Sequence, residues 1–202
     1  MRRTKEEAAL TRDAVLKAAL PVFSAKGYAA TTLEDVAQAA GVTRGAIYWH
    51  FKNKADLYAT LLDGITAAAG AVAQDAVAEG GDLATVLRRI FVNQLTAIDS
   101  DRRLQSLVAL SLSRTEQVPE LATRRKKQIR AGKAMLAELT AFMEEGIRAG
   151  AFRSDLDPAD AARAFLALQN GAIQLWLVTQ RGFSLSASAE GLADILLNGL
   201  AA

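Results

Sequence analysis

Apolar residues recur three or four positions apart over most of the chain, which is the spacing of amphipathic helices. The first stripe, from Ala8 to Phe23, predicts a helix over about residues 5–26 that Pro21 kinks and Gly27 ends. The same reasoning predicts further helices at about residues 33–39, 44–50, 53 to the late seventies, 83–98, 101–112, 119–149, 158–180 and 188–200. No alternating strand pattern is present. The chain is therefore expected to be all-α, with about nine helices.

Composition narrows the function classes. Of 202 residues, 51% are hydrophobic, only 3 are Pro and none is Cys, which excludes disulfides, zinc–thiolate sites and thiol catalysis. There is one His, at position 50, and neither an HExxH motif nor a phosphate-binding glycine loop. We therefore expect no enzyme, no metal and no cofactor. The lack of an apolar run of about 18 residues and of a signal-peptide pattern predicts a cytoplasmic protein that does not contact a membrane.

Charge is divided unevenly along the chain. Residues 1–54 hold nine Lys and Arg against five Asp and Glu, whereas residues 55–202 hold fifteen against seventeen. A basic end joined to a mildly acidic remainder suggests that the N-terminal part meets a polyanion, although a chance distribution of solvated charge would look similar.

The segment Leu33 to Phe51, LEDVAQAAGVTRGAIYWHF, predicts two short helices joined by a tight turn. Val36, Ala37, Val42 and Ile47 take the inward positions, and Gly41 stands where the turn needs a positive φ. This is the spacing of a helix-turn-helix, although a short helical turn in another kind of bundle would have the same spacing.

The outward face of the second helix carries groups that suit DNA. Arg44 can bind guanine bidentately, and Tyr48, one turn later, can contact a thymine methyl group or a phosphate. Gly45 weakens so short a helix, which suggests a close approach to a flat surface. Lys54 can contact a phosphate together with free backbone N–H groups, and Thr32 can do the same.

The stretch TTLEDVAQAAGVTRGAIYWHFKNKADLYATLL resembles the N-terminal domain of TetR-family transcriptional repressors, and the lead-in RRTKEEAALTR is similar to AcrR-like regulators of multidrug efflux pumps. The resemblance implies a helix-turn-helix DNA-binding domain, residues 1–51, and a larger helical ligand-binding and dimerisation domain, residues 52–202. By matching positions it implies a DNA surface of Thr32, Thr43, Arg44, Gly45, Tyr48, Trp49, His50 and Lys54. Trp49 could instead pack inside the protein, His50 could be a surface or capping residue, and Thr43 is expected to cap its helix first.

Segment 158–180 is apolar on two sides, and one side includes the polar positions Gln169 and Asn170. Together with the last helix it resembles the four-helix dimer interface of the family, although a monomeric core would give the same pattern. A palindromic operator favours the dimer. The expected interface residues are Leu168, Leu175, Trp176, Leu192, Ile195 and Leu196.

A ligand pocket is expected among the central helices, because a few polar residues interrupt their apolar stripes. The candidates are Ile90, Phe91, Gln94, Gln105, Val108, Met135, Leu139, Phe165, Leu166 and Asn170, each of which could equally be a core or surface residue. We expect a hydrophobic or aromatic effector to release a homodimeric repressor from a double-stranded, pseudo-palindromic operator. The alternative is a DNA-binding regulator of the same fold without a small-molecule inducer.

Overall fold

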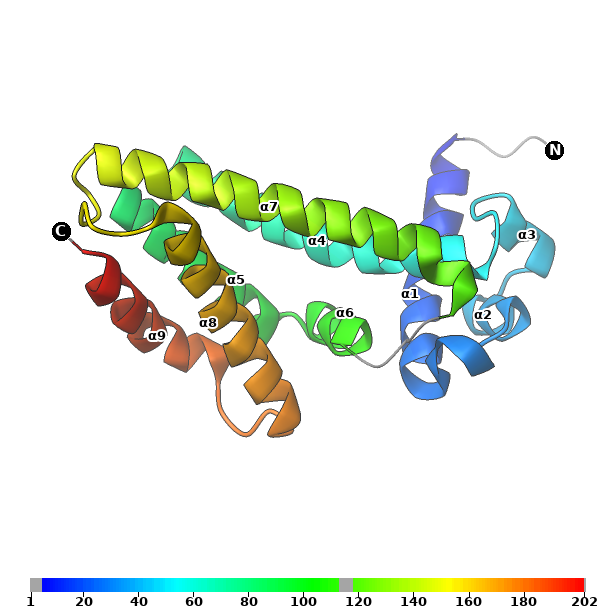
Figure 1. Cartoon of the computed structure of the whole chain (residues 1–202). Helices are drawn as coiled ribbons and strands as arrows, with labels where there is room; N and C mark the ends of the chain where they lie inside the picture. The colour runs from blue at the N-terminus through cyan, green and yellow to red at the C-terminus, as the bar shows by residue number, and fades with distance from the viewer. Residues whose placement is uncertain (1–4, 113–117, 202) are drawn as a thin grey trace. The chain divides into compact units, whose positions relative to one another are not determined.

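The computed structural model describes residues 5–112 and 118–201, and its regular elements there are helical (Figure 1). The bounds are α1 Lys5–Ala30, α2 Leu33–Ala40, α3 Arg44–Tyr48, α4 Lys54–Ala78, α5 Leu83–Ser100, α6 Arg102–Leu112, η1 Pro119–Leu121 (a 3-10 turn), α7 Ala122–Arg148, α8 Pro158–Val178 and α9 Leu185–Leu200. The all-α prediction is confirmed. Among the described helices, none has both the length and the apolarity to cross a membrane.

The helix ends follow the local chemistry of the sequence. Helix α1 is continuous through Pro21, and its regular turns stop at Gly27, which has φ 73°. Helix α9 begins at residue 185, three residues before the predicted start, because the hydroxyl of Ser184 accepts a hydrogen bond from the N–H of Ala187 and caps it. Helix α3 ends at Tyr48, two residues earlier than predicted.

The chain forms two compact units, which we describe separately. The first comprises the residues up to 67 together with 103–124, and the second comprises 68–102 and 125 onward. The first unit is thus larger than the predicted domain 1–51, because the first part of α4 and most of α6 belong to it.

The core of the first unit is an aromatic cluster. The rings of Phe23, Tyr28 and Tyr58 lie within 5.0–6.1 Å of one another, and Leu107 and Leu121 belong to the same buried cluster. The hydroxyl of Tyr28 donates to Glu120 Oε2 at 3.1 Å, and the Arg124 guanidinium lies 5.7 Å from the centre of the Tyr58 ring. The start of α7 is thereby fixed to the end of α1 and to α4.

In the second unit, α5 packs along α9 and also contacts α8. Polar contacts fix the ends of the α5–α9 pair. Arg88 on α5 bonds both Glu190 and Asp194 on α9, and Asp99 accepts hydrogen bonds from Ser184 and Ser186 at the start of α9. These contacts set the register of the two helices.

Gly146 on α7 lies directly beneath the ring of Phe152, so that a Cβ atom there would overlap the ring. We predict that Gly146→Ala lowers the free energy of unfolding by about 1–3 kcal/mol, because the added methyl group overpacks a rigid site. Gly132→Ala on the same helix meets open space and should raise stability by about 0.5–1 kcal/mol. Urea unfolding of both variants measures the difference, and equal effects would contradict the packing described.

Candidate nucleic-acid interface

Helices α2 and α3 form the predicted helix-turn-helix. Gly41 adopts φ 65° in the turn, and the N–H of Val42 donates to the carbonyl of Ala37 at 3.0 Å. Val36 and Ile47 are fully buried, so the inner faces of the two helices are fixed in the core of the first unit. The outer face of α3 is left for other contacts.

Two threonines place the helix starts. Thr32 accepts from the N–H of Asp35, and its own N–H and hydroxyl donate to the Asp35 carboxylate at 2.9 Å, which forms a capping box on α2. The Lys26 ammonium, followed by the N–H and hydroxyl of Thr32, lowers the pKa of Asp35 to about 2. Thr43 caps α3 by accepting from the N–H of Ala46. Contacts from either threonine to DNA stay a prediction.

The outward side of α3 is exposed and cationic. Arg44 and Tyr48 are exposed, and the guanidinium Nη2 donates to the Tyr48 hydroxyl at 3.0 Å, a hydrogen bond that favours the charged arginine and raises its pKa. Trp49, just after the helix, is 89% exposed, so the alternative in which it packs inside this chain is wrong. His50 is half-buried, with its ring against Phe51.

Gly45 has room around it. A Cβ atom there would be 3.8 Å from the Thr43 hydroxyl, which is ordinary contact. Nothing in the described part of the chain requires glycine at this position, since its φ lies outside the left-handed region. This agrees with a role in close approach to an external surface.

Four of the predicted DNA contacts converge on one surface hollow of about 480 Å³. Thr32, Arg44, Tyr48 and Lys54 line it, together with the carboxylate-bearing Glu34 and with Asn53, which precedes α4. The structure therefore brings residues of α2, α3 and α4 to one place, as the resemblance implies. Thr43, Gly45, Trp49 and His50 do not line this hollow.

Lys54 differs from the expectation. Its ammonium donates to the carbonyl oxygens of Tyr28, Ala29 and Thr31 at 2.9, 3.2 and 2.9 Å, and it lies 4.5 Å from the centre of the Tyr28 ring. Three donors are all that an ammonium has. The free cation expected to meet a phosphate is instead a clamp on the end of α1, and the sequence did not show this because the acceptors are backbone atoms more than twenty positions away.

Comparison with known proteins decides the family. Residues 15–61 match the family described as bacterial regulatory proteins, tetR family, and residues 82–202 match the MAATS-type transcriptional repressor, C-terminal region. The chain is 34% identical to the HTH-type transcriptional regulator TtgR of Pseudomonas putida, over 99% of this chain and 96% of the relative. The chain belongs to the TetR family. It is a transcriptional regulator with a DNA-binding helix-turn-helix, and the family is not enzymatic.

Solved structures of TetR-type regulators agree with this membership. NalD, the secondary repressor of the MexAB-OprM multidrug efflux pump in Pseudomonas aeruginosa, has a TM-score of 0.84 at 27% identity, covering 98% of both chains. SmeT in complex with triclosan has a TM-score of 0.83 at 25% identity, covering 96% of this chain and 92% of that one.

The predicted ligand residues do not form one set. Ile90, Phe91, Gln94, Phe165 and Leu166 lie on α5 and α8 of the second unit, where the rings of Phe91 and Phe165 meet edge to face at 5.5 Å. Gln105 and Val108 are buried in the first unit, and the half-buried Leu139 lies on α7. Two candidates are corrected. Met135 is 49% exposed on α7, and Asn170 is exposed and donates to the carbonyl of Leu166 on its own helix.

Sequence reasoning missed Gln169, the neighbour of Asn170. Only 8% of Gln169 is exposed, and its Nε2 donates to Gln94 Oε1 at 2.6 Å. The stripe in the sequence contained both polar residues, and the wrong one was chosen because adjacent helical positions point about 100° apart and the pattern did not settle which faced inward.

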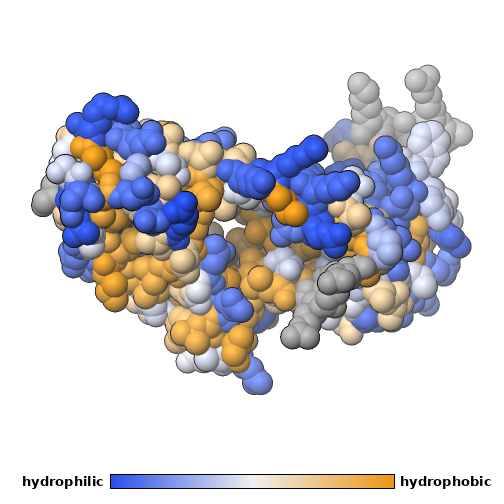
Figure 2. All heavy atoms as spheres, in the orientation of Figure 1, coloured by the Kyte–Doolittle hydropathy of each residue, from blue (hydrophilic) through white to orange (hydrophobic). Residues whose placement is uncertain are grey.

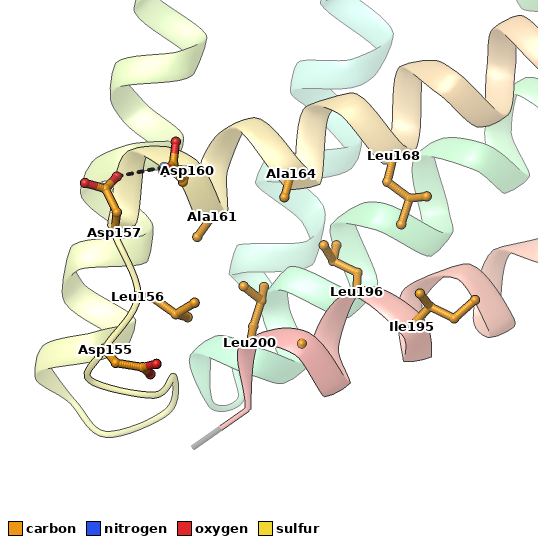
Figure 3. A pocket seen from close by; sticks show the side chains of 11 residues that line it. Asp155, Leu156, Asp157, Asp160, Ala161, Ala164, Leu168, Ile195, Leu196 and Leu200 are labelled. Carbon is orange, nitrogen blue, oxygen red and sulfur yellow. Dashed lines mark hydrogen bonds between the residues drawn. The ribbon is translucent and has the colours of Figure 1, made fainter.

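The predicted dimer residues are also divided by burial. Trp176 and Leu196 are buried within the second unit and cannot supply much interface area, which corrects two of the six predictions. Leu175 and Ile195 are exposed, Leu168 and Leu192 are half-buried, and the exposed Val178 extends the same face of α8. Hydrophobic residues gather over this part of the surface in Figure 2. Between α8 and α9, Ala164, Leu168, Ile195 and Leu196 line a groove of about 520 Å³ (Figure 3).

Lys54→Met tests the clamp. Replacing the ammonium leaves three carbonyls without their donor, so we predict a loss of about 1–3 kcal/mol in the free energy of unfolding, the range for hydrogen bonds to charged groups. Lys52→Met, two residues away on an exposed side chain, should change stability by less than about 0.5 kcal/mol. Chemical unfolding of both variants measures this. A Lys54→Met variant as stable as wild type would show that the clamp does not hold the first unit together.

Proposed function

We propose that this chain is a homodimeric repressor that binds a pseudo-palindromic operator and is released by a hydrophobic or aromatic small molecule, and that it controls a multidrug efflux pump. It would act on DNA in the cytoplasm. The observation that carries the proposal is the exposed face of α3, where Arg44, Tyr48 and Trp49 stand out from a rigidly capped helix-turn-helix.

Each exposed group has a role in this proposal. Arg44, released from Tyr48, binds the O6 and N7 acceptors of a guanine, while Tyr48 contacts a thymine methyl group or a phosphate. Gly45 lets α3 approach the base edges. Thr32 and the α4 start meet the phosphate backbone, with Lys54 placing the α4 start rather than contacting phosphate through a free ammonium.

The dimer follows from the operator and from the exposed face of α8 and α9. One five-residue helix reads too few base pairs for a specific site, and two copies related by a twofold axis read two half-sites about 34–36 Å apart. Leu175, Val178 and Ile195 form an exposed apolar face of the kind that marks a protein contact, and the groove between α8 and α9 gives the face its relief.

Release by an effector is supported by SmeT, whose structure contains triclosan, and the efflux link is supported by NalD. Helix α4 is continuous from Lys54 to Ala78, so it begins in the first unit and ends in the second. A ligand that favours a different position of α4 changes the spacing of the two α3 helices, by no more than its preference for that state allows. The alternative, a regulator of this fold that does not respond to a small molecule, keeps every DNA contact and lacks this step.

The direct experiment is a fluorescence-anisotropy titration at fixed salt. The labelled duplex is the intergenic DNA beside the gene, the competitor is random duplex, and the additives are triclosan and a panel of apolar drugs. Specific binding that a compound releases supports the whole proposal. Specific binding that nothing releases favours the alternative, and binding no tighter than to random duplex contradicts a local operator.

Arg44→Ala is expected to cost about 1–3 kcal/mol in operator affinity and to relax the preference at one base pair, because a bidentate contact to a guanine is lost. Glu34 stands in the same hollow, and Glu34→Ala is the matched control that keeps the arginine. Competition with operators changed at single positions measures both effects. If Arg44→Ala bound operator as tightly and as selectively as wild type, the assignment of Arg44 to base reading would be wrong.

Ile195→Asp is expected to weaken the dimer, because a charge would be buried in the apolar face of α9. Asn198→Asp, one turn later on the same helix and also exposed, is the control for added charge. Analytical ultracentrifugation should show monomer for Ile195→Asp at a concentration where wild type and Asn198→Asp are dimers. A monomeric wild type would refute the proposed assembly.

A further inference from the structure

The interior of the second unit contains a chain of hydrogen bonds that joins three helices. Nε2 of Gln169 on α8 donates to Oε1 of Gln94 on α5 at 2.6 Å. Nε2 of Gln94 donates to the carbonyl oxygen of Ala69 on α4 at 3.2 Å. The second of these bonds reaches the same helix that begins, at Lys54, in the first unit.

The two amides form a layer next to an aromatic one. Phe91 meets Phe165, and one turn later along each helix Gln94 meets Gln169, so α5 and α8 run in the same direction along this contact. The next inward positions, Leu95 and Ala172, are buried and apolar. The amide pair is thus a polar island in apolar surroundings, and such groups are costly unless they are hydrogen-bonded.

The amide of Gln169 is only partly satisfied. A glutamine amide can make four hydrogen bonds, and among the described residues this one makes the single bond to Gln94, although the side chain is more than nine-tenths buried. Its carbonyl oxygen is not fully enclosed, so a small molecule can reach it. Beside it the apolar surface of Ile90, Leu166 and Ile173 is half-buried rather than sealed.

We infer that Gln169 is the polar anchor for the effector and that Gln94 carries its effect to α4. The carbonyl oxygen of Gln169 accepts a hydrogen bond, so the ligand class is a neutral aromatic molecule with a hydroxyl donor, such as a phenol, whose ring packs against Phe91 and Phe165. A charged ligand is disfavoured because these two amides and two rings offer no counter-charge. This inference rests on the proposed function and specifies its effector site.

The same bond explains how binding reaches α4. When a ligand hydroxyl donates to Gln169, the amide turns toward the ligand and its bond to Gln94 weakens. Gln94 then follows, and its bond to the Ala69 carbonyl opens. Helix α4 loses a side-chain contact that holds it in the DNA-binding position, which shifts the population toward the released state by the ligand's preference for it.

The test uses ligand pairs that differ only in the donor, 4-phenylphenol with 4-methoxybiphenyl, and triclosan with its methyl ether. Isothermal titration of the wild-type dimer without DNA should show each phenol binding about threefold to tenfold more tightly than its ether, the range for one hydrogen bond. Gln169→Met should bind phenol and ether equally. Asn170→Ala, next in the chain, exposed and bonded to its own helix, should keep the wild-type preference.

Several outcomes overturn the inference. They are equal binding of phenol and ether by wild type, no binding of either pair, or a phenol preference that survives in folded Gln169→Met. The wild-type comparison needs no variant, so it decides the question even if Gln169→Met does not fold. Gln94→Met should still prefer phenols yet no longer release operator on binding them, and release equal to wild type would refute the coupling. Failure of the repressor proposal appears separately, as the absence of specific operator binding in the ligand-free protein.

Discussion

The clamp formed by Lys54 is the interaction on which the DNA-binding end of this protein depends. The regular turns of helix α1 stop at Gly27, and the carbonyls of Tyr28, Ala29 and Thr31 lie beyond them. One ammonium at the start of α4 satisfies all three and lies over the Tyr28 ring as well. Because α2 and α3 are strung between these two points, fixing the end of α1 to the start of α4 fixes the frame in which α3 is presented.

Within that frame, the threonines, glycines and apolar residues divide the work between folding and recognition. Thr32, Gly41 and Thr43 are occupied in starting and ending helices, and Ile47 fills the core. What remains on the outside of α3 has no such structural duty. The side chains of Arg44 and Tyr48 are hydrogen-bonded to each other, and Trp49 is almost fully exposed, which is an unfavourable place for a large aromatic ring unless a partner covers it.

Periodicity and capping chemistry were enough to predict the fold, because each helix carries its own apolar stripe and most carry their own start signal. They failed where the deciding partner is distant in sequence. The bonds of Lys54 go to backbone atoms 23 to 26 positions away, which no side-chain pattern records. On α8 both sides are apolar, so the choice between Leu175 and Trp176, or between Gln169 and Asn170, depends on how the helix is rotated against α5 and α9. The structure supplies that rotation: it buries Trp176 and Gln169 and exposes their neighbours.

The most direct test of the account uses the two tryptophans, since Trp49 is 89% exposed and Trp176 only 2%. Acrylamide should quench Trp49 efficiently in the free protein, with the Trp49→Phe variant giving the signal of Trp176 alone. Adding specific operator duplex should shield Trp49 and lower its quenching constant toward that of a buried ring, whereas random duplex at the same concentration should not. If operator bound with full affinity and left Trp49 as accessible as before, the face of α3 described here would not be the surface that meets DNA.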